Sequence, residues 1–429
     1  MEPKKFLFVS FDALIGDIAW QVVKEGHQVK FYIKNKEYKE VGDGLVEKVD
    51  DWKKEVEWAD IIVFDDVLGM GEKADQVRKQ GKLVVGGTAY TDKLEDDRSF
   101  GQEEMKKVGI PILPYKEFKS FDEAIKYVKE NPGRYVIKPS GEAESIKGLL
   151  FIGEEEDGRD VIEVLQDYQQ AWEKKIPVFQ LQKRVTGVEI GVGAFFNGKE
   201  FAYPINVNFE HKKLFPGNIG PSTGEMGTSM FWSGPNRIFN QTLKKMESKL
   251  TEEKYVGYID LNCIVNNYGI YPLEFTARFG YPTISIQQDS MITPIGEFLY
   301  ELAEGSLNKF KVKSGFHIGV RIVVPPFPFH DKETFNVKSK DSVIFFKKPI
   351  EGVHPEDVKK IENQWVVTGN SGVVLIVCSS GQSMKQAQAN VYNKIKNINI
   401  PHMYYRDDIG ERWFEDSDKL HSWGFLREN

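Results

Sequence analysis

The chain has 429 residues, a formal net charge of −7, and 41% hydrophobic and 28% charged residues. This length is too great for one hydrophobic core and predicts roughly three domains of about 150 residues each. The acidic balance argues against a protein that binds nucleic acid mainly through phosphate contacts. The longest apolar runs, such as residues 372–378, are far too short to span a bilayer. We therefore expect a globular protein with neither nucleic acid nor a membrane as a partner.

The cysteines, the histidines and the first residues bear on metal binding and on the compartment. Cys263 and Cys378 lie far apart, each in an apolar run, so neither a disulfide framework nor a cysteine metal site is expected. The seven histidines lack the paired spacing that holds zinc. The opening residues, MEPKKFLFVSF, lack the apolar core and cleavage site of a signal peptide. These features predict buried, reduced thiols in a cytoplasmic protein.

The first 90 residues alternate between apolar runs and an amphipathic segment. Residues 5–11 are typical of a strand and residues 15–26 of a helix, and further short strands are expected at QVKFYI, ADIIVF and KLVVGG. Such alternation predicts a parallel sheet with helices on both faces.

The segment after residue 120 has a different pattern. Residues 121–131 form an amphipathic helix that ends at a Pro-Gly pair, and RYVIKPS and GLLFIG are two strands joined by GEAESIK. A long amphipathic segment follows at 160–175, and VFQLQKRV and EIGVGAFFNG make another strand pair. We expect a small antiparallel unit with helices, distinct from the first domain.

The remaining elements complete a mixed fold. A helix is expected at 237–250, a hairpin of two strands at 257–280 around the turn NNYG, and short strands from about residue 314 before a helix at 383–397. The fold class predicted for the whole chain is α/β, or α+β overall, with a doubly wound N-terminal domain.

Two lysines flank a loop that contains glycine. Lys138 ends the strand RYVIKPS, and Lys147 with Gly148 closes the loop that follows. Backbone N–H groups in such a loop and two lysine charges suit a polyphosphate. The spacing is not that of the P-loop, and a lysine at a strand end is usually just solvated, so this segment alone is weak evidence.

A second candidate segment lies in QLQKRVTGVEIGV. Gln182 and Glu189 are seven residues apart, with the apolar Val185 between them. A strand whose backbone groups meet an adenine edge needs a following acid to hold the ribose hydroxyls. Taken alone, an ordinary surface strand with a turn is the favoured interpretation.

The predicted hairpin carries two carboxylates. Asp260 falls on its first strand and Glu274 on its second, where facing positions would let the pair share one or two Mg²⁺ ions that bridge phosphates. Arg278, four residues further on, can bind an anionic group with two hydrogen bonds. The alternative is a pair of solvated acids, but Glu274 lies in an otherwise apolar stretch.

The stretch GNIGPSTGEMGT, residues 217–228, is too rich in glycine for a helix interior and too long for a tight turn. In isolation it suits either an anion-binding loop or a plain surface loop.

These pieces occur in the order seen in ATP-grasp ligases, and four segments resemble one family, phosphoribosylamine–glycine ligase (glycinamide ribonucleotide synthetase) of purine biosynthesis. LEDDRSFGQEEMKKVGIP resembles its LEGSKxFxKxFMxxxGIP, and EHKKLFPGNIGPSTGEMGT resembles its DHKR…GPNTGGMG. LEFTARFGYP resembles its IEFNCRFGDP, and MYYRDDIGER resembles its YRxDIGxR. The resemblance runs in register from about residue 94 to residue 412.

The resemblance implies three domains and a reaction. The N-terminal α/β domain would cover residues 1–95, the ATP-grasp domain 96–313 with a small lobe at about 125–192, and the C-terminal domain 314–429. A carboxylate would attack the γ-phosphoryl group of ATP, and an amine would open the acyl phosphate to an amide. The expected cofactors are ATP and Mg²⁺ or Mn²⁺, and the partners are small-molecule substrates of a monomer or small homo-oligomer.

The resemblance also assigns roles to individual residues. The nucleotide would be held by Arg98, Lys138, Lys147, Gly148, Gln182, Lys183, Val185 and Glu189; the metal by Glu274, Asp260 and Thr276; and the acyl donor and transferring phosphoryl group by Arg278, Thr223 and Gly224.

Several positions depart from the family pattern. Thr276 replaces an asparagine, Ser222 another asparagine, and Glu225 a glycine, which adds a negative charge to the glycine-rich loop. The stretch SFDALIGDIAW replaces GxGGREHALAW, which receives a sugar phosphate in the family, and FDD at residues 64–66 replaces GPE. Aspartates do not attract a phosphate.

These departures leave two alternatives beside a glycinamide ribonucleotide synthetase. The first is the same chemistry on a different amine, because Asp65 and Asp66 would favour a cationic acceptor. The second is a nucleotide-binding protein without ligase activity, which only Thr276 and Gln182 favour.

Overall fold

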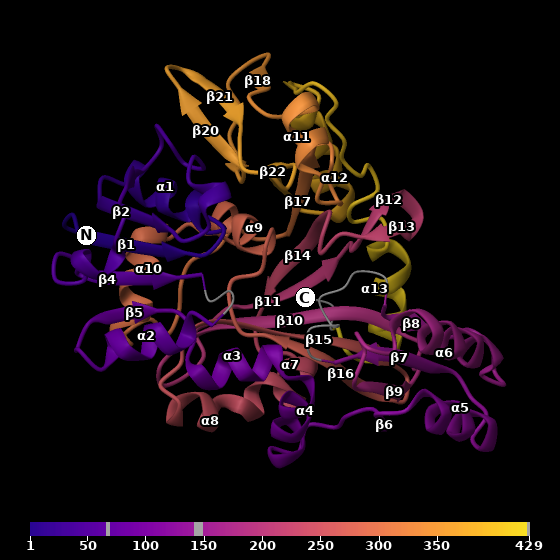
Figure 1. The fold of residues 1–429 in the computed structure, drawn as a ribbon. Helices are drawn as coiled ribbons and strands as arrows, with labels where there is room; N and C mark the ends of the chain where they lie inside the picture. Colours follow the sequence, from indigo (N-terminus) through magenta and orange to yellow (C-terminus); the bar gives the residue numbers. More distant parts are fainter. Residues whose placement is uncertain (66–68, 141–148, 427–429) are drawn as a thin grey trace.

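The computed structural model describes residues 1–65, 69–140 and 149–426. The chain begins with a five-stranded parallel sheet in the order β3-β2-β1-β4-β5 (Figure 1, left). Its strands are β1 (Lys5–Ser10), β2 (Gln28–Ile33), β3 (Glu47–Lys48), β4 (Ile61–Phe64) and β5 (Leu83–Val85).

Helices cover both faces of this sheet because its strands are apolar on both sides. Phe6 and Phe8 pack with α1 (Gly16–Lys24) and α10 (Ile295–Glu304). Leu7 and Val9 face the other side and pack with η2 (Trp52–Glu55) and α2 (Gly71–Arg78). The predicted doubly wound α/β arrangement is confirmed, although α10 comes from a segment almost 300 residues along the chain.

A small antiparallel sheet in the order β6-β9-β7-β8 forms a separate lobe (Figure 1, lower right). It contains β6 (Tyr115–Phe118), β7 (Tyr135–Pro139), β8 (Phe151–Ile152) and β9 (Phe179–Lys183), and it packs against α5 (Phe121–Glu130) and α6 (Arg159–Trp172). Two helices, α3 (Ala89–Asp96) and α4 (Arg98–Lys107), link it to the first sheet.

The expectation that VFQLQKRV pairs with EIGVGAFFNG is wrong. β9 pairs with β6 and β7, whereas the second segment forms β10 of another sheet. The chain crosses between the sheets near Gly187, where a Cβ atom would lie 2.2 Å from the carbonyl oxygen of Val265. Glycine at this position permits the close approach.

An eight-stranded antiparallel sheet in the order β16-β15-β10-β11-β14-β17-β22-β19 is the centre of the molecule. Its strands are β10 (Val188–Asn197), β11 (Ile205–Glu210), β14 (Gly227–Ser233), β15 (Val256–Asn266), β16 (Gly269–Thr276), β17 (Phe316–Val323), β19 (Val353–Pro355) and β22 (Val373–Gly381). The predicted hairpin at 257–280 is present as β15 and β16. The sheet contains strands from both sides of residue 314 in the sequence, and the domain limits at 95 and 313 stay a prediction.

One face of this sheet is an apolar core. Alternate residues of β10, from Val188 to Phe196, pack with the helices α7 (Arg237–Gln241), α8 (Glu247–Glu252) and α13 (Trp413–Ser422) and with η5 (Leu243–Met246). Because neighbouring residues of a strand point to opposite faces, Glu189, Gly191 and Gly193 face the other side, where the polar residues gather.

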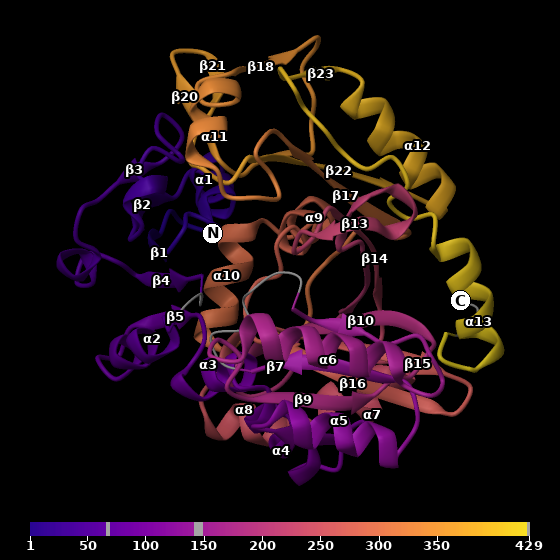
Figure 2. The ribbon, with the colours of Figure 1, turned by 45° about the vertical axis from the view of Figure 1, so that its right-hand side comes forward.

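The C-terminal part adds a second small sheet in the order β20-β21-β18-β23. It consists of β18 (Val343–Phe346), β20 (Val358–Ile361), β21 (Gln364–Val367) and β23 (Ile398–Asn399), with α11 (Lys332–Lys338) beside it. The helices α12 (Met384–Ile395) and α13 follow one another along one side of the molecule (Figure 2). No helix within the described residues is long and apolar enough to cross a membrane.

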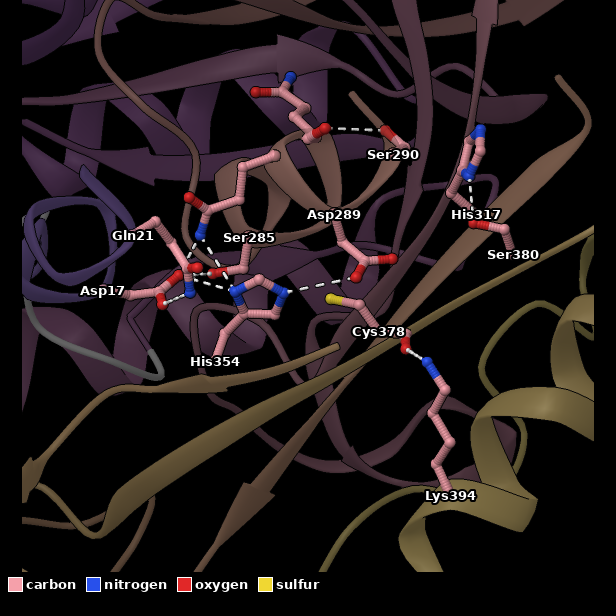
Figure 3. Close-up of polar contacts among 12 residues, drawn as sticks. Asp17, Gln21, Ser285, Asp289, Ser290, His317, His354, Cys378, Ser380 and Lys394 are labelled. Carbon is pink, nitrogen blue, oxygen red and sulfur yellow. Dashed lines mark hydrogen bonds and ion pairs between the residues drawn. The ribbon is translucent and has the colours of Figure 1, made fainter. Parts of the chain in front are cut away.

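A buried histidine joins three parts of the fold (Figure 3). His354 of β19 places Nδ1 2.9 Å from Oδ2 of Asp17 in α1 and Nε2 3.9 Å from Oδ1 of Asp289 in α9 (Thr283–Ser290). Asp17 also accepts a hydrogen bond from Gln288 of α9. Burial opposes the charge on the imidazole, but Asp17 raises the pKa of His354 well above its usual value. An imidazolium between two carboxylates therefore ties the N-terminal helix to the central and C-terminal parts.

We expect the replacement His354→Gln to destabilise the protein in a pH-dependent way. The contribution of a group with a raised folded-state pKa is complete below its unfolded pKa of about 6.5 and is lost as the pH rises through the folded-state pKa. At pH 6 the loss should reach about 3 kcal/mol, because the buried Asp17 and the partly buried Asp289 lose their cation. Chemical denaturation of both proteins from pH 6 to 9 should show the difference shrinking as the pH rises.

The exposed His330 offers a matched control for this experiment. His330→Gln should leave the stability unchanged at every pH. A loss in His354→Gln that is constant across the pH range would contradict an imidazolium at this junction.

Candidate active site

The polar face of the eight-stranded sheet brings together acids from four strands. The cross-strand pairs are Asp260 with Thr276 and Asn262 with Glu274 on β15 and β16, so these four side chains share one face. Glu210 of β11 belongs to the same group, because Nδ2 of Asn262 donates to its Oε2 at 3.2 Å. Asp260 and Glu274 lie on paired strands as expected, but not at facing positions: Asp260 lies opposite Thr276 and Glu274 lies opposite Asn262, so each acid is two residues from the position opposite the other.

Asp260 lies in a network of buried polar groups. Its Oδ2 accepts hydrogen bonds from the hydroxyl of Tyr258 at 2.9 Å and from Nδ2 of Asn208 at 2.8 Å. Burial, and then the nearby Glu210, raise the pKa of Asp260 to about 7. Gly193 makes the network possible, since a Cβ atom there would lie 2.0 Å from the Tyr258 hydroxyl and 2.6 Å from Oδ2 of Asp260.

Lys212 is a central residue of this face that the sequence analysis did not single out. Its Nζ lies 3.1 Å from Oε1 of Glu189 and 3.2 Å from Oε2 of Glu210. Burial alone would lower the pKa of Lys212, but Glu210 and Glu189 hold it well above its usual value. The sequence does indicate Lys212, because this residue lies in the segment EHKK, which resembles the DHKR motif of the family.

The residues predicted to hold the nucleotide lie mainly in the small sheet. Lys138 on β7 and Gln182 on β9 are buried, and Lys183 extends over the ring of Tyr135. Arg98, at the start of α4, donates from Nη1 to the carbonyl oxygen of Pro139 at 3.0 Å, which brings it to the end of β7 that carries Lys138.

The other predicted nucleotide residues are distributed between the two sheets. Val185 lies between β9 and β10, and Glu189 lies on β10, where Lys212 holds its carboxylate. Lys147 and Gly148 lie outside the described residues. A cavity of about 20 Å³ between α4 and β16 is lined by Arg98 and Glu274, so residues predicted for the nucleotide and for the metal meet there.

Arg278 is held by an acid that the sequence analysis did not identify. Its Nε lies 2.9 Å from Oε1 of Glu95 in α3, and Oε2 of Glu95 accepts the backbone N–H of Ala277 at 2.8 Å. Burial tends to lower the pKa of Arg278, and Glu95 more than offsets this. Glu95 therefore fixes the direction of the guanidinium predicted to meet the acyl donor.

The glycine-rich stretch at 217–228 is partly a hairpin. Its first half forms β13 (Ile219–Ser222), which pairs with β12 (Lys213–Phe215). Thr223 then donates from both its backbone N–H and its hydroxyl to the carbonyl oxygen of Lys212, each at 2.9 Å. Gly224 follows with φ of 83°, a conformation that favours glycine. The second half of the glycine-rich stretch thus lies along the segment that carries Lys212.

The C-terminal motif MYYRDDIGER braces this stretch. The fully buried Arg406 donates to the carbonyl oxygen of Lys213 at 2.9 Å and to Oδ1 of Asn218 at 3.1 Å, and both oxygens of Asp408 bind its guanidinium at 2.6–2.7 Å. Asp408 also accepts the backbone N–H of Gly217 at 3.0 Å. The motif therefore supports the loop rather than supplying reactive groups itself.

Arg412, at the end of the same motif, reaches the strands that carry the acids. It donates to the carbonyl oxygens of Glu189 at 2.7 Å and of Glu210 at 3.2 Å, and Asp416 holds its Nε at 2.8 Å. Arg412 thereby fixes the spacing of β10 and β11 next to Lys212.

The carboxyl edge of the N-terminal sheet carries carboxylates where an anion would otherwise bind. The fully buried Asp65 follows β4 and accepts hydrogen bonds from the Ser10 hydroxyl and from the backbone N–H of Phe11 at 2.9 Å. Asp92 accepts the backbone N–H of Gly71, the first residue of α2, at 3.1 Å, and burial raises its pKa to about 6. Asp66, the other predicted acid, lies outside the described residues.

The side-chain oxygen atoms of Glu274, Thr276 and Asp260 suit a hard cation that also binds phosphates. Within residues 1–65, 69–140 and 149–426, no group of three or more His, Cys, Asp or Glu side chains is arranged to hold a metal ion. Mg²⁺ bound with phosphates needs only one or two carboxylates, with the remaining positions taken by phosphate and water. Glu274, which is exposed, and Thr276 and Asp260 on the same face supply oxygen atoms of this kind.

Comparison with known proteins matches two parts of the chain to family models. Residues 96–284 match the family model of the phosphoribosylglycinamide synthetase ATP-grasp (A) domain, and residues 335–412 match that of the phosphoribosylglycinamide synthetase C domain. A phosphoribosylamine–glycine ligase of Lactococcus lactis is 26% identical over 339 residues, which is 77% of this chain and 78% of the relative.

Solved structures share the fold. A phosphoribosylamine–glycine ligase from Thermotoga maritima superposes with a TM-score of 0.70 at 21% identity and covers 94% of this chain and 100% of its own. The biotin carboxylase domain of the Hydrogenobacter thermophilus 2-oxoglutarate carboxylase, with MgADP, ADP and bicarbonate, superposes with a TM-score of 0.64 at 14% identity over 100% of both chains.

Proposed function

Since the chain is an ATP-dependent ligase of the ATP-grasp type that resembles phosphoribosylamine–glycine ligase, we propose that it joins an amino acid to an amine through an acyl phosphate. The observation that carries the proposal is the polar sheet face: Glu274 and Asp260 lie beside a lysine held by two acids, under a braced glycine-rich loop.

Different parts of the site would have different roles in the reaction. Arg98, Lys138 and Gln182 would hold ATP, with Glu189 at the ribose, and Glu274, Asp260 and Thr276 would hold Mg²⁺, which would neutralise charge on the phosphates. A carboxylate oxygen of the donor attacks the γ-phosphorus as its bond to ADP breaks. The amine nitrogen then attacks the acyl carbon, phosphate leaves with the former carboxylate oxygen, and the nitrogen loses a proton. Thr223, Gly224 and Arg278 would position the groups that react.

The acceptor is a separate question, and the structure favours an amine without a phosphate group. The N-terminus of α2 attracts anions through its free N–H groups, but Asp92 already accepts the first of them. Asp65 places a second carboxylate at the end of β4. We propose a neutral or cationic amine as the acceptor, and phosphoribosylamine as the alternative.

The compartment, the partners and the oligomeric state are part of the same proposal. We propose that the protein works in the cytoplasm on small molecules, as a monomer or small homo-oligomer.

Release of ADP in the presence of different carboxylates tests the proposal. With hydroxylamine, a small nucleophile that traps acyl phosphates, we expect ADP and a hydroxamate to form in equal amounts and only with Mg²⁺ and an amino acid. Binding of ATP without ADP release under any combination would instead indicate a nucleotide-binding protein.

The same assay separates the two acceptor classes. Phosphoribosylamine and amines without a phosphate would be compared at a fixed concentration of the best amino acid. Saturation by an unphosphorylated amine and no response to phosphoribosylamine would support the first class, and the reverse would contradict it.

A further inference from the structure

Glu225 is the one acid of the glycine-rich loop, and the structure buries it against the polar sheet face. Only 6% of the residue is exposed. The backbone N–H of Met226 donates to the carbonyl oxygen of His211 at 2.8 Å, and that of Thr223 donates to the carbonyl oxygen of Lys212 at 2.9 Å. These bonds on either side of Glu225 hold it beside the segment that carries the site lysine.

The carboxyl group of Glu225 lacks a cation of its own. Its Oε1 is buried and has no hydrogen-bond partner among the described residues. The nearby Arg321 donates to the backbone oxygen of Glu225 at 2.7 Å, but both oxygens of Glu356 already bind its guanidinium at 2.7–2.9 Å. Burial, and then the charge of Glu210, raise the pKa of Glu225. A cation next to this carboxyl group would offset both effects.

Among the described residues, two side chains on β11 and β14 also carry a buried oxygen atom without a hydrogen-bond partner. Oγ1 of Thr228 and Oδ1 of Asn208 are buried, and neither has a partner within the described part of the chain. Thr228 lies directly opposite Glu210 across β14 and β11, and Asn208 is two residues from Glu210 on the same strand face. Unpartnered oxygen atoms in the loop and on the polar sheet face can accept hydrogen bonds from an ammonium group, which has three N–H donors.

The neighbouring lysine shows that this face accommodates an ammonium group. Lys212 places its own ammonium between Glu189 and Glu210 at 3.1 and 3.2 Å. A further divalent ion here would lie close to that positive charge, whereas a second monovalent ammonium group would be repelled less.

We propose that Glu225, with Thr228 and Asn208, binds the ammonium group of the carboxylate donor. This inference rests on the proposed ligase function. Glu225 lies three residues before Thr228, which is opposite Glu210 on the polar face of the central sheet, where the donor carboxylate would meet ATP, whereas Asp65 and Asp92 lie at the N-terminal sheet. Glu225 is thus a specificity residue that selects donors with an amino group close to the carboxylate.

The test compares donors with and without an amino group. ADP release with hydroxylamine would be measured for glycine and β-alanine against acetate and propionate, in wild type, Glu225→Gln and Glu225→Asp. We expect Glu225→Gln to raise the KM of the amino acids roughly 10- to 100-fold, as for the loss of a charge-assisted hydrogen bond. The KM of ATP should not change, acetate and propionate should remain without effect as donors, and Glu225→Asp should recover part of the loss.

The outcomes distinguish this inference from the function on which it rests. If wild type releases ADP with glycine and Glu225→Gln keeps the same preference for glycine over acetate, the inference is wrong and the ligase function stands. A shift in the Mg²⁺ requirement without a change in that preference would make Glu225 a metal residue instead. If no carboxylate releases ADP with the wild type, the proposed function itself is wrong. The exposed Glu333 serves as the control, since Glu333→Gln should change none of these values.

Discussion

Replacement of Glu274 by alanine is expected to lower kcat by about 100-fold or more while leaving the fold intact. Glu274 is exposed on β16, beside the half-buried Leu273 and the buried Phe275, so its loss removes no buried side chain. A metal ion at the transferring phosphoryl group supplies several kcal/mol of charge stabilisation, and each 1.4 kcal/mol corresponds to about tenfold in rate. The measurement is steady-state ADP release over a range of Mg²⁺ concentrations.

The control for this variant is Glu333→Ala, which removes an exposed acid at the start of α11. It should retain the wild-type rate. The conservative change Glu274→Gln should keep one oxygen ligand and lose less activity at high Mg²⁺ than Glu274→Ala. A near wild-type rate for Glu274→Ala would contradict the metal assignment.

Replacement of Arg406 by alanine is expected to lower the free energy of unfolding by about 3–5 kcal/mol, the usual cost of removing one partner from a buried ion pair. Arg406 is completely buried and binds Asp408 with both arms of its guanidinium. The same side chain bonds to Lys213 and Asn218. The variant should therefore also lose activity, because the glycine-rich loop loses its brace.

Chemical denaturation followed by tryptophan fluorescence measures this effect. Arg159→Ala is the matched control, since Arg159 at the start of α6 forms an exposed pair with Glu155 at 3.0 Å, and exposed pairs contribute little to stability. Arg406→Lys should restore little, because an ammonium cannot bind both oxygens of Asp408 in this geometry. Equal stability of Arg406→Ala and Arg159→Ala would show that the loop does not depend on this pair.

Elements with strong local signals could be predicted from the sequence. The N-terminal sheet follows from its short apolar runs, and the hairpin of β15 and β16 follows from the turn NNYG between two apolar segments. The antiparallel small lobe was also predicted, except for the place of EIGVGAFFNG. That segment forms β10 of the central sheet, and no local pattern shows which sheet a strand will join, because the partner strands are distant in the sequence.

The sequence predicted only those site residues that lie in recognisable motifs. Acids such as Glu189, Asp260 and Glu274 stand out by position, but the lysine that links two acids and the glutamate that holds Arg278 are defined by contacts between distant strands. Glu95 is separated from Arg278 by more than 180 residues, so only the folded chain pairs them. The junction of Asp17 and His354 is equally non-local, and no motif indicated it.

The fate of the donor oxygen tests the central claim most directly. The donor amino acid would carry a heavy oxygen isotope in its carboxylate, and the phosphate released with ADP would be analysed by mass spectrometry. If the reaction proceeds through an acyl phosphate, each released phosphate contains one labelled oxygen, in step with the amide formed. Phosphate without label, or ADP release that is independent of the donor, would show that water attacks ATP and would contradict the proposed ligase.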